Sequence, residues 1–254
     1  MKGRASILAA LFLLLPPPAL ARATSVAPNP CEGPAAAQLL CPNLRIGAAS
    51  EIYAERRGGG VLLRATSNVK SRGRGPIEVR GIRNGPRSMR VNQRIYRVGG
   101  GHLDLGTRAS LRFTDVGSYF GGRYWKVHQL ARFELWSIDG HRRLRHLVRV
   151  GPKLNYCLRD LERTRPGRRS PATRHYPGCN QNPFRDRVTL GTSVGWSDIY
   201  PANYAQQWIP VKGLRGCFAF VMRVDPRNLL YESDERDNSS RRLVRLPFRA
   251  DTAC

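Results

Sequence analysis

The sequence predicts an all-β protein, and three observations carry this prediction. Its apolar residues fall in short runs, alternating with polar residues or continuous over a few positions, as in strands. Clusters of Gly, Pro, Asn and Asp, such as "RNGPRS" and "SIDGH", separate these runs as turns do. The six cysteines are an even number, which favours disulfides in an exported chain. We therefore expect an immunoglobulin-like β-sandwich with long irregular loops, stapled by disulfides.

The first residues, "MKGRASILAALFLLLPPPALARATS", have the three parts of a secretory signal. A basic start is followed by an apolar centre over residues 7–15 and by small residues before a cleavage site after Ala21 or Ala23. The apolar centre is too short to span a membrane, and no later run approaches the length needed. We expect a secreted protein with a signal peptide over 1–23, an N-terminal segment over 24–40 and one domain over 41–254.

Short strands are expected along the whole domain. Residues 131–138, "ARFELWSI", begin with a strict alternation of apolar and polar side chains, the period of a half-buried strand. Residues 217–224, "CFAFVMRV", are apolar without alternation, which predicts a central strand buried on both faces. The predicted strands are 44–53, 61–66, 77–80, 94–98, 110–113, 131–138, 144–150, 208–211, 217–224 and 241–247. Segment 159–207 has little regular pattern, and we expect a functional site there.

The six cysteines allow fifteen pairings. We favour Cys31–Cys41, Cys157–Cys179 and Cys217–Cys254. The first two pairs each close a short loop, and the third ties down the C-terminus. This choice stays one of several that the sequence allows.

The formal charge of +25 predicts an affinity for anionic surfaces. Basic runs such as "KSRGRG", "HRRLRH" and "RTRPGRR" are spread along the chain, and most basic residues are arginine. Outside the cell, such a protein would meet cell-wall polymers, acidic polysaccharide or released nucleic acid. The alternative is a solvated surface from an arginine-rich genome. No specific nucleic-acid-binding motif is present.

The chain has no common catalytic motif. Ser193-Val194-Gly195 lacks the context of a nucleophile elbow, and there is no "HExxH" or phosphate-binding glycine loop. The five histidines never occur two residues apart, so no ready-made copper or zinc cluster is visible.

Four stretches, read in order, resemble the lysyl oxidase family, including its exported bacterial members. They are "CPNLRI" (41–46), "RYWKVHQLARFEL" (123–135), "GPKLNYCLRD" (151–160) and "SVGWSDIYPANYAQQWIPVKGLRGCFAFVMRVDPRNLLYESDERDN" (193–238). The resemblance implies an enzyme that oxidises peptidyl lysine or other primary amines to aldehydes, using copper and a quinone made from a lysine and a tyrosine. Lys153 and Tyr200 match these two precursor positions.

The copper ligands that the resemblance implies are missing. The family has an alternating His-x-His-x-His before the strand that here contains "FEL". Gly122, Tyr124 and Lys126 occupy these positions, or, one residue earlier, Gly121, Arg123 and Trp125. A protonated lysine cannot donate a lone pair to a cupric ion. His128 lies beyond the last ligand position, so we expect neither copper nor the lysine tyrosylquinone.

The calcium-binding residues that the resemblance implies are matched better than the copper ligands. Glu232, Asp234, Asp237 and Asn238 match its calcium loop, and Asn43 and Leu44 match the partner segment. Calcium favours six to eight oxygen ligands in a tolerant geometry, and this set supplies carboxylate, amide and carbonyl oxygens. The alternative is an acidic hairpin that offsets nearby arginines.

We therefore expect a copper-free, catalytically impaired homologue that acts as a calcium-stabilised cationic binding module. The alternative is an active amine oxidase with a rearranged metal site, built from His128 with His102 or His175. A third hypothesis is an exported polyanion binder whose fold is incidental to its activity.

Overall fold

The computed structural model describes residues 28–254, and the predicted signal peptide lies outside this range. Within it the chain is all-β, as predicted: turns and two short 3-10 helices join the strands, and there is no α-helix. The strands are β1 (Leu39–Leu40), β2 (Leu44–Ile46), β3 (Ser50–Arg57), β4 (Gly60–Ser71), β5 (Ile77–Gly85), β6 (Ser88–Arg97), β7 (His102–Asp115), β8 (Arg123–Val127), β9 (Ala131–Ile138), β10 (Leu144–Val150), β11 (Glu162–Arg163), β12 (Arg187–Thr192), β13 (Trp196–Tyr200), β14 (Trp208–Pro210), β15 (Gly216–Val224) and β16 (Ser239–Leu246). The 3-10 helices are η1 (Pro34–Gln38) and η2 (Ser118–Phe120).

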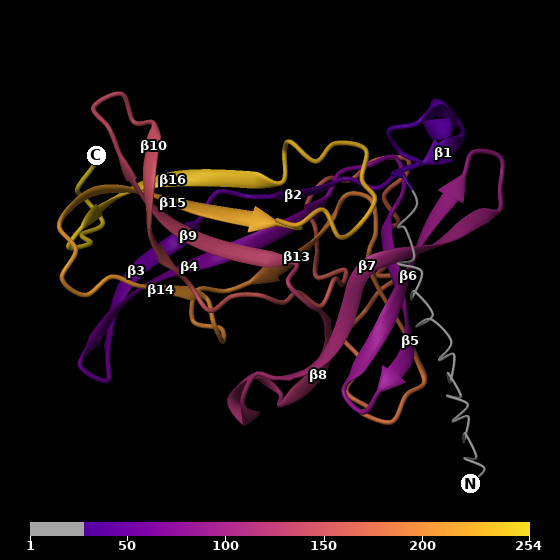
Figure 1. Cartoon of the computed structure of the whole chain (residues 1–254), viewed down its shortest axis with the longest axis horizontal. Coiled ribbons are helices and arrows are strands. Elements are labelled where there is room, and N and C mark those ends of the chain that lie inside the picture. Colours follow the sequence, from indigo (N-terminus) through magenta and orange to yellow (C-terminus); the bar gives the residue numbers. More distant parts are fainter. Residues whose placement is uncertain (1–27) are drawn as a thin grey trace, which may run out of the picture.

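The strands form three antiparallel sheets (Figure 1). The β6 sheet has the order β12-β5-β6-β7-β8, with β1 also paired to β6. The β15 sheet has the order β10-β9-β15-β16, and the β4 sheet has the order β11-β13-β4-β14, with β2 and β3 also on β4. The β15 and β4 sheets are in contact through β14 with β9 and through β2 with β15. One continuous apolar core involves strands of all three sheets.

Strand β15 lies at the centre of its sheet, as its unbroken apolar sequence predicts. It pairs with β9 on one side and β16 on the other. Phe220 and Met222 are fully buried. In β9 the alternation places Phe133 and Leu135 in the core, while Arg132 reaches solvent.

Three strand predictions need correction. Segment 159–207, expected to be irregular, contains β11, β12 and β13, whose small and polar residues hide the alternation. Strand β8 was not among the predicted strands, yet "RYWKV" pairs along β7. The predicted strand 44–53 is two strands, β2 and β3, interrupted at "GAA", and both pair with β4.

The structure contains three disulfides, Cys31–Cys41, Cys157–Cys179 and Cys217–Cys254, the pairs favoured from the sequence. The first holds the N-terminal segment on the domain. Leu39 of this segment is buried in a small cluster with Ile95 and Tyr231. No helix among residues 28–254 is long and apolar enough to cross a membrane.

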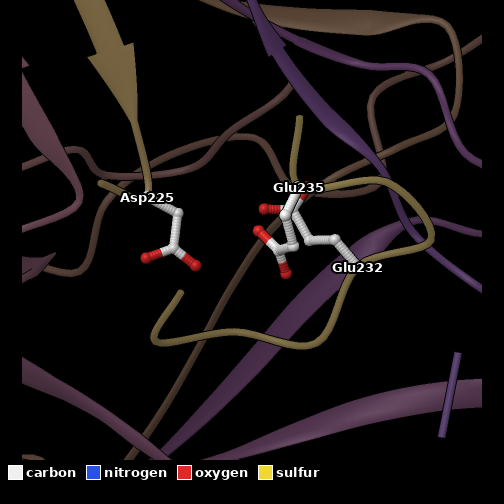
Figure 2. A group of neighbouring side chains, drawn as sticks. All are labelled: Asp225, Glu232 and Glu235. Carbon is white, nitrogen blue, oxygen red and sulfur yellow. The ribbon is translucent and has the colours of Figure 1, made fainter. Parts of the chain in front are cut away.

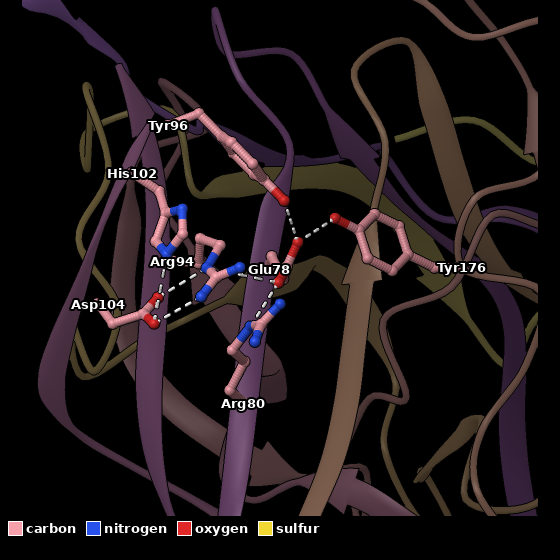
Figure 3. A network of polar contacts seen from close by, with 7 residues as sticks. All are labelled: Glu78, Arg80, Arg94, Tyr96, His102, Asp104 and Tyr176. Carbon is pink, nitrogen blue, oxygen red and sulfur yellow. Dashed lines mark hydrogen bonds and ion pairs between the residues drawn. The ribbon is translucent and has the colours of Figure 1, made fainter. Parts of the chain in front are cut away.

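A buried carboxylate ties the β6 sheet to the loop that precedes β12 (Figure 3). Glu78 accepts hydrogen bonds from the Tyr96 and Tyr176 hydroxyls at 2.6 and 2.7 Å and from Arg80 at 2.7 Å. Although burial raises the pKa of Glu78, the hydrogen bonds from the two tyrosines and Arg80 outweigh it and lower the pKa overall. The carboxylate is therefore a fully partnered structural charge.

Candidate functional site

The structure brings Lys153 and Tyr200 together, although 46 residues lie between them in the sequence. Lys153 lies in the segment after β10, and Tyr200 ends β13. The Lys153 ammonium nitrogen is 3.7 Å from the centre of the Tyr200 ring and 4.4 Å from that of Tyr156. The Tyr200 hydroxyl accepts a hydrogen bond from the Cys157 backbone N–H at 3.1 Å. Lys153 and Tyr200 are 1% and 2% exposed, so solvent hardly reaches this pair.

Lys126 is the second lysine of this cluster. Its nitrogen is 5.2 Å from the centre of the Tyr200 ring, 5.4 Å from that of Tyr204 and 5.9 Å from that of Tyr124. Tyr124 and Lys126 lie two apart on β8 and therefore share one face of the strand. Burial lowers the pKa of Lys126 to about 8, although Asp198 acts in the opposite direction.

Asp198 is the carboxylate of the cluster and is fully buried. It lies two residues before Tyr200 on β13, so both side chains leave the same face of the strand. Its partners are Arg159, at 3.5 Å, and the Leu158 backbone N–H, at 3.2 Å. Burial raises the pKa of Asp198 to about 6, against the opposing effect of Arg159.

The cluster therefore holds three basic side chains against one carboxylate. Burial and the like charge of Lys126 hold the pKa of Lys153 well below its usual value. The Gln207 amide, in the orientation that satisfies both of its ends, accepts a hydrogen bond from the Lys153 nitrogen at 3.0 Å and donates to Ser67. We refer to Lys126, Lys153, Arg159, Asp198 and Tyr200 as the lysine–tyrosine cluster.

The lysine–tyrosine cluster does not fit a cupric ion. Of the positions Gly122, Tyr124 and Lys126, the last brings an ammonium group to the Tyr200 ring, where a metal would need a lone-pair donor. Gly121, Arg123 and Trp125, the positions of the other register, also supply no imidazole. Trp125 is buried and its indole N–H bonds the Asn182 carbonyl at 2.9 Å.

The histidines do not supply a replacement site. His128 contacts the Asn155 side-chain oxygen at 3.0 Å, His102 lies 3.7 Å from Asp104, and His175 meets the Tyr176 ring edge to face. Within residues 28–254, the only group of three or more metal-ligating side chains close enough to share an ion contains no histidine. It comprises Asp225, Glu232 and Glu235, which converge near the end of β15 (Figure 2).

The six residues predicted to bind calcium are partly assembled. Glu232 is fully buried, accepts a hydrogen bond from the Leu44 backbone N–H, and accepts another from the Asn238 amide at 3.0 Å. The Asn43 amide donates to Asp237 at 3.1 Å. Two of the carboxylates pair with arginines, Asp234 with the exposed Arg236 at 2.9 Å and Asp237, through its Oδ2 atom, with Arg45 at 3.0 Å.

Three side-chain oxygens among the predicted calcium ligands are buried without a hydrogen-bond donor. They are the Oδ1 atoms of Asn43, Asp237 and Asn238. Burial also raises the pKa of Glu232 well above its usual value, with the nearby Glu235 adding to the effect. Unpartnered oxygens beside a buried carboxyl group form a donor set that a hard cation could satisfy.

The sequence identified several members of both clusters but missed others. Asp198 was inside a quoted stretch, and its spacing of two from Tyr200 on a strand would have placed both on one face. Lys126 was named from the sequence, but only as a residue that cannot replace a copper ligand. Asp225 and Glu235 lay in the same stretch, Glu235 within the acidic loop itself, but they were not named as ligands. A comparison with protein-family models finds no match for this chain, and a comparison with curated proteins also finds none.

Proposed function

We propose that this protein is a secreted, lysyl-oxidase-like β-domain that works without copper and without amine oxidation. Its activity is then binding, through a cationic surface on an immunoglobulin-like sandwich stabilised by calcium. The contact between Lys153 and Tyr200 supports the resemblance to the lysyl oxidase family, because the resemblance requires these two residues to meet.

One observation carries the loss of copper chemistry: the ammonium group of Lys126 lies against the Tyr200 ring, buried at 2% exposure. A cation held there by the protein repels a metal ion and offers it no lone pair while protonated. The low exposure of Lys153 and Tyr200 also disfavours catalysis, since a peptidyl amine needs access to both. An active amine oxidase with a rearranged metal site is the alternative, and the scattered contacts of the histidines count against it.

The decisive test is the mass of the peptides that carry Lys153 and Tyr200, from protein secreted with copper available. We expect two separate, unmodified peptides. A matched variant, Gly122→His/Tyr124→His/Lys126→His, restores imidazoles at all three positions and should yield the cross-linked species. A Lys153–Tyr200 cross-link in the unchanged protein would refute the proposal and support the oxidase. Lys153→Arg in the triple variant supplies the background signal.

We also propose that the acidic loop binds calcium. Asn43, Glu232, Asp237 and Asn238 would hold the ion, with Asp234 able to join by leaving Arg236. The bound ion would supply positive charge to a buried carboxylate and link β2 to the segment before β16. Its role is then structural. The three unpartnered oxygens support this assignment over an acidic hairpin that merely offsets arginines.

Thermal unfolding tests the calcium proposal. Protein stripped with a chelator should gain about 2.7 kcal/mol in free energy of unfolding when calcium reaches a hundred times its dissociation constant. Glu232→Gln should abolish this gain without harming the metal-free protein, because it removes a buried charge. Asp251→Asn, at an exposed position, is the control of equal charge and should keep the full gain. An equal gain in Glu232→Gln would place the ion elsewhere.

A further inference from the structure

An arginine-lined cavity lies beside the end of β4 and shares no lining residue with the lysine–tyrosine cluster. It has a volume of about 520 Å³, within the usual range for small-molecule sites. Five of its lining residues are arginines, and none is acidic. They are Arg72, Arg74, Arg165, Arg168 and Arg169. We call this cavity the arginine pocket.

The arginines of the pocket are not neutralised by the protein. None of the five takes part in an ion pair within residues 28–254, whereas elsewhere arginines such as Arg94 and Arg223 meet carboxylates. Burial lowers the pKa of Arg72, and the like charges of Arg165, in the pocket, and of Arg45, outside it, add to the effect. Like charges gathered in one cavity without a counterion favour an anionic ligand.

Two buried donors of the pocket also lack partners. Ser71 is fully buried, and its hydroxyl makes no hydrogen bond. The Nη1 group of Arg72 is likewise buried and unbonded, although its Nη2 group donates to Thr164 at 3.3 Å. Buried donors are rarely left unpaired in folded proteins, so their presence in a ligand-sized cavity indicates a missing acceptor.

The walls of the pocket are fixed by backbone contacts. The Gly195 N–H donates to the Ser71 carbonyl and the Arg165 N–H to the Gly195 carbonyl, both at 2.9 Å. Gly195 has a φ of +80°, and a Cβ there would lie 2.2 Å from the Arg165 carbonyl oxygen. Only glycine permits this close approach, which brings the loop with Arg165, Arg168 and Arg169 over Ser71.

We infer that the arginine pocket binds a tetrahedral oxyanion, a phosphate or sulfate ester on a sugar unit of an extracellular polymer. Guanidinium groups match such oxyanions with paired N–H donors, and the Ser71 hydroxyl adds a neutral donor. A cavity of about 520 Å³ leaves room for the sugar that carries the ester. This inference rests on the cationic binding function proposed above and assigns it a site and a ligand class.

Calorimetric titration of the disulfide-bonded protein tests the pocket, with glucose 6-phosphate and glucose 6-sulfate as probes at fixed salt. Arg165→Gln/Arg169→Gln should weaken binding of the preferred ester at least tenfold. Arg56→Gln/Arg90→Gln removes the same charge from exposed positions outside the pocket and should change it less than twofold. Comparison of the two probes decides between phosphate and sulfate. Equal losses in both double variants would overturn the assignment of a site.

Ser71→Ala separates ligand binding from folding. Removing an unpartnered buried hydroxyl should leave the protein as stable as before or more stable, while the ester binds severalfold more weakly. Lower stability with unchanged affinity would give Ser71 a structural role and count against the pocket.

A sulfated polysaccharide measures the wider cationic function separately. If the polymer binds but neither ester does, the pocket inference fails and the proposed function stands. If none of these ligands binds, both fail.

Discussion

Replacing Lys126 by methionine tests whether a buried cation beside Tyr200 is held at a cost. Methionine keeps the unbranched shape of the side chain and removes its charge. A fall in pKa from 10.5 to about 8 corresponds to about 3 kcal/mol, by which folding disfavours the protonated lysine. At 2% exposure, solvent does little to screen this cost. We therefore expect Lys126→Met to be more stable than the unchanged protein by about 3 kcal/mol at pH 7.

The pH dependence of this difference gives the sharper test. The pKa of Lys126 is lower in the folded state, so the unfolded chain binds more protons between about pH 8 and pH 10.5. The stability of the unchanged protein should therefore rise through this window relative to Lys126→Met. The advantage of the variant is full below pH 8 and nearly gone at pH 10.5.

Urea unfolding at a series of pH values between 7 and 10.5 measures the difference, because urea does not screen charges as guanidinium salt does. Lys212→Met, at an exposed position, is the matched control and should show no such trend. A variant less stable at pH 7, or a difference that stays constant with pH, would refute the reasoning. Either result would mean that the Lys126 charge is stabilised where it lies.

Two further predictions concern contacts that stabilise the fold. Tyr176→Phe should lower the free energy of unfolding by about 1.5 to 3 kcal/mol at pH 7, because it removes a hydrogen bond to the charged Glu78. Folding lowers the pKa of Glu78, so the stability lost in Tyr176→Phe should shrink as acid protonates the carboxylate. Urea unfolding that shows an equal loss at pH 7 and pH 3 would contradict this prediction. Gly195→Ala should lower the stability more than Gly213→Ala. Both glycines have a φ of +80°, but only at Gly195 would a Cβ meet a backbone oxygen. Equal shifts in melting temperature for the two variants would argue against close packing at Gly195.

Local sequence patterns were enough for the all-β class and for the strands with the strongest apolar character. Strand β15 could be placed at the centre of a sheet because no polar residue interrupts its core. Strands β12 and β13 were not predicted because the short runs "RVTLGT" and "WSDIY" mix polar and apolar residues. They pair with β5 and β4, which are far away in the sequence. Sheet pairing of this kind depends on tertiary contacts more than on local preference.

For the candidate sites too, the sequence indicated one part and the fold decided the other. The residue types were visible in the sequence: two lysines and a tyrosine that the resemblance singles out, and an acidic loop. Their protonation was not visible. Burial sets the pKa of Lys126 at about 8 and that of Asp198 at about 6, and burial is a property of the folded chain alone.

The sequence by itself determined the all-β class, the basic charge and the absence of histidines spaced two residues apart. Only the tertiary structure decided which charges meet. It placed Lys126 and Lys153 against one tyrosine, and it left five arginines around a cavity without a carboxylate. The physical reason is that charge interactions depend on distance and local dielectric, and sheet pairing between remote segments sets both.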